Sequence, residues 1–418
     1  MYHKKTSAKS GDACCKLLGM TSSPELLRKT VAPSLDLPWE TDIVALRRDF
    51  HAHPELGFEE VRTAGIVAQR LRDLGLEVRE NVGKTGVVGL LKGAKDGPCV
   101  LVRADMDALP IREENSWEWK SEASGKMHAC GHDAHTAIGL SVARLLTADR
   151  DQLAGSVKFM FQPAEEGMGG AGRMIRDGVL EDPKPDFALG LHVWSQLQMG
   201  TLGVSSGPVM ACADEFKARI LGQGGHGAIP HQTVDAVVMA AHVVTALQSI
   251  VARNIKPLDA GVVTVGKLHA GDAFNVIPGE AFLEGTTRAF APDVRKTLEN
   301  RCREIIETLP KAFGGRGEFN FIPGYPATVN DETVVNRLLP AFQRAAGAEN
   351  VHPFEPTLGA EDFSMVLEQI PGCYFFVGAR NEAIGAIYPH HHPKFNLDES
   401  ALHLGARAMV AAVKELLS

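Results

Sequence analysis

Two short motifs carry side chains that can hold metal ions and move protons. The first, His-Ala-Cys-Gly-His-Asp-Ala-His, places Cys130 and His132 two residues apart. The second, Phe-Gln-Pro-Ala-Glu-Glu-Gly, contains the neighbouring carboxylates Glu165 and Glu166. Thiolate, imidazole and carboxylate are the side chains that bind a zinc-like divalent ion. The two motifs together indicate a metal-binding hydrolase site, in which one glutamate is a ligand and the other is a general base.

Further donors lie elsewhere in the chain, where ordinary structural roles compete with metal binding. His192 ends an apolar run, and a single histidine in such a place is more often a satisfied core residue. Three consecutive histidines at 390–392 precede Pro393. A neighbouring glutamate pair is usually a solvated acidic face, but this pair is bracketed by Pro163 and Gly167, which favours a loop after a strand.

The elements that position these residues follow from apolar runs bounded by glycine, proline or charge. A helical pattern covers residues 40–76 and is broken at His53-Pro54, and a second helix is predicted over Thr136–Leu146. The strand-like runs are Gly86–Leu91, Cys99–Ala104, Val157–Phe161 and Phe187–Val193. Strands with helices between them predict an α/β sheet.

A second block of elements begins near residue 202. Its pattern is strand 215–221, helix 234–250, strands 261–267 and 281–288, helix 294–309, and strand 318–322. This βαββαβ (ferredoxin-like) order predicts a small sheet with helices on one face. Mixed helix and strand patterns return after residue 325. We therefore predict an α/β catalytic domain with a mixed sheet and helices on both faces (36–202 and 321–418), an inserted smaller domain (203–320) and a flexible lead-in (1–35).

Length and composition limit the class of protein. The 418 residues suffice for two cores, and 44% hydrophobic with 22% charged residues is typical of a soluble globular protein. The net charge of -8 comes without long basic runs, so we expect no nucleic-acid partner. Seven scattered cysteines argue against a disulfide framework and predict a cytoplasmic protein. No apolar run approaches a signal or membrane-spanning segment, so we expect no membrane partner.

The motifs resemble the amidohydrolase branch of the aminoacylase and carboxypeptidase metallopeptidases. That branch includes hippurate hydrolases, N-acyl-L-amino-acid amidohydrolases and plant hydrolases of indole-acetyl amino acids. Besides the two motifs above, the matching blocks are Asp49-Phe-His-Ala-His-Pro-Glu-Leu-Gly-Phe-Glu-Glu60, Arg103-Ala-Asp-Met-Asp-Ala-Leu-Pro110, Gly190-Leu-His-Val-Trp194, Gly224-Gly-His226, Phe274-Asn-Val-Ile-Pro278, Gly359-Ala-Glu-Asp-Phe363 and Phe395-Asn-Leu-Asp-Glu399. The resemblance therefore covers nearly all of the chain beyond the lead-in.

The resemblance implies two divalent metal ions per chain, with zinc, manganese or cobalt as candidates. The implied ligands are Cys130, His132, Glu166, His192 and His391, and His390 or His392 could replace the last of these. The resemblance also makes Glu165 the base and acid, and it makes Asp107 a carboxylate that orients a ligand. The residues implied to reach the substrate are His226, Asn275 and Arg288.

The implied reaction is hydrolysis of the amide bond of a small N-acyl amino acid. Arg288 can grip a carboxylate, and His226 and Asn275 can donate hydrogen bonds to an oxyanion if the smaller domain closes over the site. The smaller domain often forms a dimer contact in this family, so a homo-oligomer is a further expectation. The alternatives are a dipeptidase or carboxypeptidase of the same fold, or a non-catalytic metal- or ligand-binding protein. The presence of Glu165 beside the ligands disfavours the last alternative.

Overall fold

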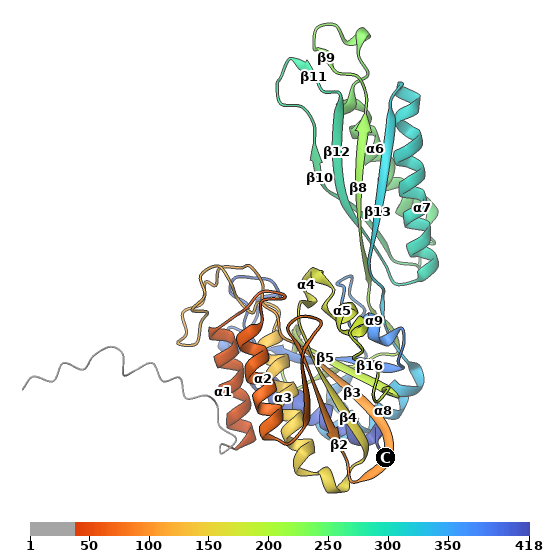
Figure 1. The fold of residues 1–418 in the computed structure, drawn as a ribbon. Helices are drawn as coiled ribbons and strands as arrows, with labels where there is room; N and C mark the ends of the chain where they lie inside the picture. Colours follow the sequence, from red (N-terminus) through yellow and green to blue (C-terminus); the bar gives the residue numbers. More distant parts are fainter. Residues whose placement is uncertain (1–37) are drawn as a thin grey trace, which may run out of the picture.

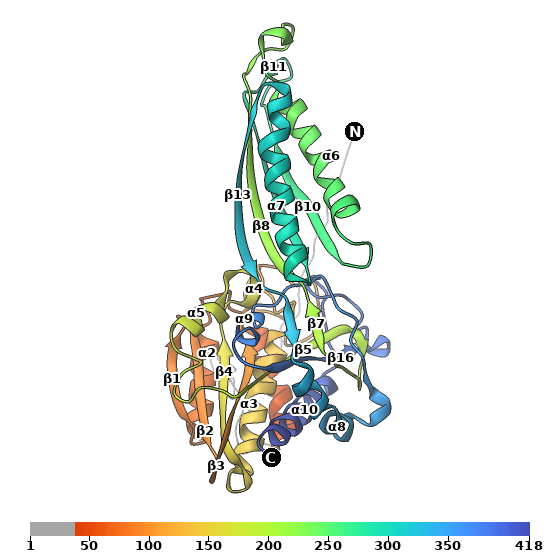
Figure 2. The same ribbon diagram turned by 90° about the vertical axis from the view of Figure 1, so that its right-hand side faces the viewer.

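The chain folds into a broad body that carries the metal-binding motifs and a narrow body that stands on it (Figures 1 and 2). The computed structural model describes residues 38–418, so the predicted lead-in, with Cys14 and Cys15, lies outside the described residues. The long strands β8 (Cys212–Leu221) and β13 (Arg316–Tyr325) connect the two bodies, since the lower end of each strand lies above the broad body.

The broad body is built on an eight-stranded mixed sheet with the order β1-β2-β4-β3-β5-β16-β6-β15. Its strands are β1 (Glu77–Val82), β2 (Gly86–Lys92), β3 (Lys95–Asp105), β4 (Ala154–Gln162), β5 (Phe187–Gln198), β6 (Leu202–Gly203), β15 (Val351–His352) and β16 (Gly372–Arg380). The central strands β4, β3, β5 and β16 are parallel. They are rich in Val, Leu, Phe and Ala because both of their faces are covered.

Helices cover both faces of this sheet, which confirms the predicted mixed α/β architecture. The long helices share one hydrophobic core with one face of the sheet; they are α1 (Trp39–Ala52), α2 (Val61–Asp73), α3 (His132–Ala148), α8 (Glu332–Ala346) and α10 (Ser400–Leu416). The short helices α5 (Gly170–Arg176) and α9 (Ser364–Leu367) pack on the other face. Alternating residues of one strand divide between the two cores, as Val100 and Leu101 do.

The narrow body has an antiparallel four-stranded sheet with the order β10-β12-β8-β13. Its other two strands are β10 (Gly261–His269) and β12 (Glu280–Ala289), and its helices are α6 (Ala236–Asn254) and α7 (Pro292–Thr308). The two helices and one sheet face enclose a separate hydrophobic core. The predicted βαββαβ order of elements is confirmed, whereas the domain boundaries stay a prediction.

Short strands at the two ends of the narrow body complete the fold. At its far end, β9 (Gly225–His226) pairs with β11 (Val276–Ile277). Near the broad body, β7 (Gly207–Met210) pairs with β14 (Thr328–Asn330). These pairs were not predicted, because strands of two to four residues are too short to show a periodic pattern.

Helix α6 corrects one expectation from the sequence. It is the one helix among residues 38–418 whose length and composition would suffice to cross a membrane. Met239, Val243 and Leu247 nevertheless pack into the core of the narrow body, as in a helix that covers a sheet. The opposite side of α6 exposes Val237 and Val238, each 45% exposed. The expectation that no apolar run approaches the length of a membrane-spanning segment was therefore wrong. This helix was overlooked because alanine and histidine stand between its strongly apolar residues.

Candidate active site

The candidate site lies at the carboxyl ends of the parallel strands, where ligand sites of open α/β sheets are usually found. Cys130 and His132 stand at the start of α3, and Glu165 and Glu166 follow β4 in the one-turn helix α4 (Glu165–Met168). His192 is part of β5. Gly131, between Cys130 and His132, has a φ of +99°, and a Cβ atom at this position would lie 2.5 Å from Val193 Cγ2. Only glycine therefore allows α3 to start this close to β5.

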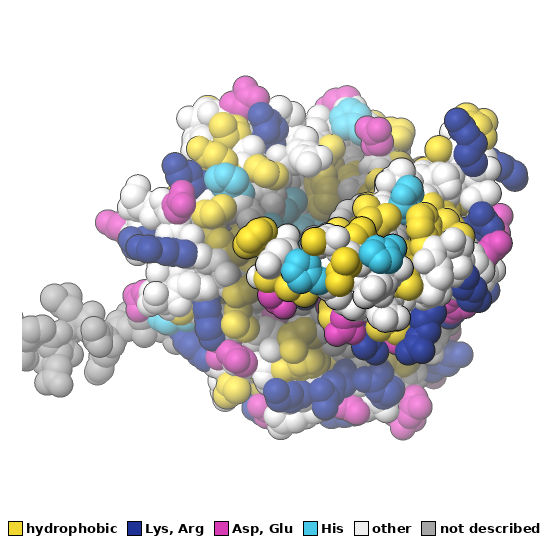
Figure 3. Space-filling model, turned by 90° about the horizontal axis from the view of Figure 1, so that it is seen from above, with side chains coloured by type: hydrophobic (Ala, Val, Ile, Leu, Met, Phe, Trp, Pro, Cys, Tyr) yellow, Lys and Arg dark blue, Asp and Glu magenta, His cyan; other side chains and the backbone are white. Residues whose placement is uncertain are grey.

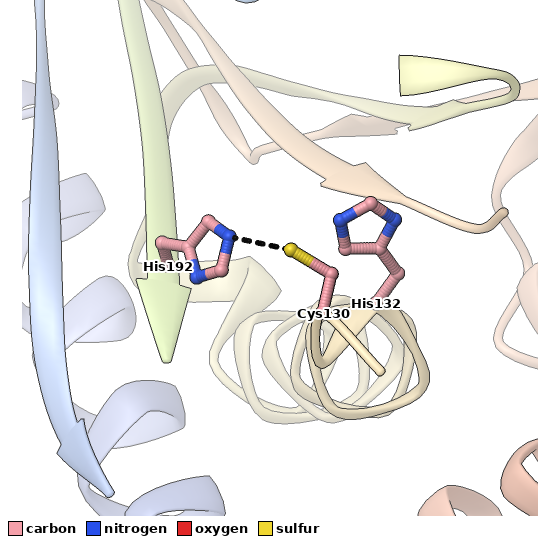
Figure 4. A group of neighbouring side chains, drawn as sticks. All are labelled: Cys130, His132 and His192. Carbon is pink, nitrogen blue, oxygen red and sulfur yellow. Dashed lines mark hydrogen bonds between the residues drawn. The ribbon is translucent and has the colours of Figure 1, made fainter. Parts of the chain in front are cut away.

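The five predicted ligands converge in two overlapping groups that share Cys130. The first group joins Cys130, His132 and His192, and the second joins Cys130, Glu166 and His391, with donor atoms within 4.8 Å of one another in each. Figure 4 shows the sulfur of Cys130 directed at His192, with Sγ 3.5 Å from Nε2, and His132 on the other side of the sulfur. The structure therefore brings together all five residues from segments far apart in the chain.

The three consecutive histidines have different surroundings. His391 Nε2 lies 3.0 Å from Glu166 Oε1. His390 instead accepts a hydrogen bond from the Ser195 N–H through Nε2, and burial together with neighbouring histidines lowers its pKa to about 3. His392 stacks on Tyr388, at 4.6 Å between ring centroids. Of the three, His391 alone stands beside the glutamate pair, as the resemblance implied.

Hydrogen bonds fix the orientation of the inner side chains. His192 Nδ1 lies 2.7 Å from the carbonyl oxygen of Val193, so its Nδ1–H donates there and Nε2 faces Cys130. Asp107 lies 3.2 Å from His132 Nδ1, and its two oxygens accept the N–H groups of Glu165 and Glu166 at 3.0 Å. One carboxylate thus positions a histidine and both glutamates, the kind of contact predicted for Asp107.

Glu165 is buried among other acids. Its side chain is part of a group with Glu361 and Asp362, and the residue is 7% exposed. Burial, and then the negative charges of Glu361, Glu166 and Asp362, raise the pKa of Glu165 well above its usual range. Such a carboxyl group has a high affinity for a proton.

A buried arginine balances this acidic cluster. Arg103 in β3 donates to Glu361 at 2.6 Å and to Asp105 at 2.7 Å, and it is 2% exposed. Tyr374 in β16 donates its hydroxyl to the other oxygen of Glu361. The sequence did not indicate a role for Arg103, Asp105 or Tyr374. A charged residue inside the apolar run of β3 was the available signal, because an arginine is almost never buried without a partner.

Most of the predicted site residues line a cavity of ≈ 450 Å³ between the two bodies. Its lining from the broad body includes Cys130, Glu165, Glu166, His192, His390 and His391, and the apolar side chains of Trp194 and Met210 also line it. Arg288 from β12 and Tyr325 from β13 reach this cavity from the narrow body. The structure therefore brings Arg288 to the site, as predicted.

His226 and Asn275 lie elsewhere. They are neighbours at the far end of the narrow body, where Val276 pairs with His226, and neither lines the cavity. Strand β12 runs from this tip to Arg288. At about 3.3 Å per residue, its length separates the two by roughly 25–30 Å. Exposed apolar side chains and histidines gather on the tip (Figure 3), and Phe274 there is fully exposed. The predicted substrate contacts of this pair are not formed in this arrangement, because spacing along the chain does not reveal how far a strand carries a loop.

Comparison with known proteins identifies the family. The sequence pattern of Peptidase family M20/M25/M40 matches residues 101–415. The chain belongs to this family. IAA-amino acid hydrolase ILR1-like 4 of Arabidopsis thaliana is 42% identical over 87% of this chain and 83% of its own length. Thermostable carboxypeptidase 1 of Saccharolobus solfataricus is 41% identical over 88% of this chain and 93% of its own.

A solved structure extends the comparison to the metal centre. The Bacillus subtilis YXEP protein, described as a dinuclear metal binding peptidase from the M20 family, superposes with a TM-score of 0.79 at 34% identity, over 91% of this chain and 98% of that one. The M20/M25/M40 assignment and these relatives make the present protein a metal-dependent amidohydrolase that uses divalent ions.

The donor atoms of this M20/M25/M40 site fit a divalent ion. His132 Nε2 is buried and has no hydrogen-bond partner. Glu166 Oε1 is likewise unpartnered, although His391 Nε2 lies 3.0 Å away without hydrogen-bond geometry. A thiol, imidazoles and a carboxylate that converge while His132 Nε2 and Glu166 Oε1 lack hydrogen bonds are suited to a shared ion.

Tyr325 holds the turn that carries both glutamates. Its hydroxyl donates to the carbonyl oxygen of Glu165 at 3.0 Å and accepts the Gly169 N–H at 2.8 Å. The turn contains Ala164 and Gly167 at positive φ, so it needs external support. The sequence did not indicate a role for Tyr325, because β13 carries it to the turn from more than 150 residues away in the chain.

We expect Tyr325→Phe to lower kcat about tenfold, because a loosened turn displaces Glu165 from the reacting atoms. Steady-state kinetics together with metal analysis would measure this effect, and metal content should not change. Tyr388→Phe is the matched control, since it removes a phenolic hydroxyl near the site that does not contact the turn. An unchanged kcat in Tyr325→Phe would show that the turn keeps its shape without this support.

Proposed function

We propose that the protein hydrolyses the amide bond of N-acyl amino acids to a carboxylic acid and a free amino acid. The observation that carries this proposal is that one cavity is lined by four of the five proposed ligands (Cys130, Glu166, His192 and His391), by Glu165 and by Arg288. A hydrolytic centre with a guanidinium group in the same cavity suits an amide whose product carries a carboxylate. The 42% identical plant relative, named an IAA-amino acid hydrolase, supports the same substrate class.

In this proposal, Cys130, His132, Glu166, His192 and His391 would hold two divalent ions. When bound, such ions polarise a carbonyl group and lower the pKa of water. One thiolate with several imidazoles favours zinc, whereas the carboxylate oxygens also suit manganese or cobalt. The overlap of the two donor groups supports a dinuclear arrangement.

Glu165 moves the proton in the proposed reaction. It takes a proton from the attacking water and later gives it to the leaving nitrogen, which departs as an amine. Its burial beside the donor groups supports this role. Asp107 positions Glu165 by accepting its backbone N–H.

Arg288 binds the free carboxylate of the amino-acid portion. Among residues 38–418, its guanidinium group makes one long hydrogen bond, of 3.5 Å, to the carbonyl oxygen of Leu358, so most of its donors are unused. A planar carboxylate can accept two of these donors at once.

A panel of substrates tests the proposal. N-acetyl, N-benzoyl and indole-acetyl amino acids, with the corresponding amino-acid amides, are incubated with metal-stripped protein before and after addition of zinc, manganese or cobalt, and amine release is measured. Metal-restored cleavage of the acids, with the amides cleaved poorly, is the expected result. Failure to cleave any N-acyl amino acid while metal is bound would overturn the proposal.

A carboxypeptidase or dipeptidase is the second candidate function. The observation in its favour is the 41% identical relative named a carboxypeptidase. Unblocked dipeptides in the same panel separate the two activities, because they differ from N-acyl amino acids only in the group that precedes the scissile carbonyl. Faster cleavage of dipeptides than of N-acyl amino acids would favour this second candidate.

We also propose a homo-oligomer that forms through the narrow body, in a cytoplasmic location. Exposed Phe274, Ile229 and Val276 at the tip support a contact surface there. The five described cysteines, all free, are compatible with a reducing compartment. Contact between this tip and a second copy would also cover His226 and Asn275, and the mass in solution measured by light scattering tests for the oligomer.

A further inference from the structure

A second cavity adjoins the first. It has a volume of ≈ 410 Å³ and lies between the turn after β4 and the open face of the narrow sheet. Four residues line both cavities, namely Gly167, Ala213, Arg288 and Tyr325. The two cavities are therefore neighbours, and Arg288 lines both.

Cross-strand register explains how the second cavity is built. Arg288, Ala213 and Tyr325 form one row across β12, β8 and β13, and the next row toward the tip is Thr286, Glu215 and Ile322. These rows are on the sheet face that α6 and α7 leave open, since Phe216 between them belongs to the helix-covered core. The second row is thus one pleat beyond Arg288.

The lining of this cavity is mainly apolar. Met168 and Met365 approach from the broad body, and Ile322 with Pro323 comes from the narrow body. Methionine side chains adapt to varied apolar shapes. Met168 is 58% exposed and Ile322 is 37% exposed, so apolar surface is available to a ligand.

The charges around this cavity disfavour an acidic ligand group. Asp214 and Glu215 both line it. Asp214 is engaged by Arg295 at 2.5 Å, and Glu215 lies 3.0 Å from Lys217. Arg288 is the only cation among the described residues of the lining, and the proposed function already assigns it to a carboxylate.

We propose that the second cavity binds the side chain of the amino-acid portion of the substrate and selects apolar side chains such as those of leucine, methionine and phenylalanine. The carboxylate and the side chain of an amino acid leave the same carbon atom, so a carboxylate on Arg288 places the side chain within a few bonds of Arg288. The adjoining apolar space is the second cavity. The acyl group then occupies the opposite corner of the first cavity, beside Trp194 and Met210. This inference rests on the proposed function.

Ile322→Ser tests the assignment with two independent comparisons of substrates, one that varies the amino-acid side chain and one that varies the acyl group. The kcat/KM ratio of N-acetyl-leucine to N-acetyl-alanine should fall about tenfold, because the leucine side chain loses an apolar contact. The ratio of N-benzoyl-alanine to N-acetyl-alanine should stay unchanged, because it reports the acyl group. Ile322→Val should retain the wild-type leucine preference. Ratios measured within one variant cancel any loss of folded protein.

Phe282→Ser is the matched control. Phe282 is 40% exposed on the same open face, two rows beyond Ile322, and it does not line either cavity. It should leave both ratios unchanged. Ile322→Lys adds a second test, since it should raise cleavage of N-acetyl-aspartate relative to N-acetyl-leucine.

Three outcomes separate the possible failures. An unchanged leucine-to-alanine ratio in Ile322→Ser would overturn the side-chain assignment. The proposed function would still stand, because the N-acyl amino acids would still be cleaved. A change in the benzoyl-to-acetyl ratio instead would also overturn it, because the cavity would then bind the acyl group. No cleavage of any N-acyl amino acid by the metal-loaded wild-type protein would overturn the proposed function and this inference with it.

Discussion

Replacing Glu165 by glutamine should lower kcat by about 10³-fold, within the range that general acid–base catalysis contributes. Glutamine keeps the size of the side chain and its backbone hydrogen bond to Asp107, but it cannot accept the proton of the attacking water. The five proposed ligands remain, so the metal content should be that of the wild type. Amine release from an N-acetyl amino acid and elemental analysis of the same sample measure the two quantities together.

Glu382→Gln serves as the control for this substitution, because Glu382 is a surface carboxylate with a 70% exposed side chain that pairs with Arg380. It should have wild-type kcat. If Glu165→Gln kept near wild-type turnover with metal fully bound, Glu165 would not be the base, and the proton would have to pass through another group. A loss of metal in Glu165→Gln would instead assign the residue to metal binding.

Much of the fold could be predicted from the sequence, because its elements are strongly patterned. The runs Val157–Phe161 and Phe187–Val193 proved to be parts of the central strands β4 and β5. Apart from Lys158 and His192, these runs are apolar on both faces, which is typical of a covered parallel sheet. The βαββαβ order was also readable, since its helices and strands are each long enough to show a period.

The site could be predicted most directly where short motifs hold several functional residues together. Cys130 with His132, and Glu165 with Glu166, fall within single motifs, and the structure brings both pairs into overlapping groups of donor atoms. The contact of Arg103 with Glu361 joins residues 258 positions apart, which no local pattern indicates.

The distal tip shows a second limit. The motif that contains Asn275 was recognisable, but its distance from the cavity depends on the length of β12 and on the angle between two bodies. Neither quantity is encoded in residue spacing. Contacts between separately folded units therefore need the structure, whereas contacts within one turn do not.

His391→Asn should remove most of the bound metal from one of the two donor groups and lower kcat/KM by at least about 10²-fold, which exceeds the usual effect of outer residues that only orient ligands. The reason is geometric: His391 is the histidine whose Nε2 faces Glu166, and a shorter asparagine cannot bring a nitrogen to that position. Metal per chain after dialysis, followed by activity with added zinc or manganese, gives the measurement.

The neighbouring histidines provide internal controls that also decide the remaining ambiguity of the triplet. His392→Asn should keep its metal and its activity, because His392 stacks on Tyr388 and accepts the Lys394 N–H, away from Glu166. His390→Asn should lower the melting temperature more than the metal content, because it removes a ring packed 4.8 Å from Trp194 and an acceptor for the Ser195 N–H. Metal loss in His390→Asn or His392→Asn but not in His391→Asn would move the ligand assignment to that residue. Since three adjacent histidines offer the same chemistry, the direction in which the backbone presents each ring decides which one can bind the ion, and the φ of +64° at His391 turns the chain at this point.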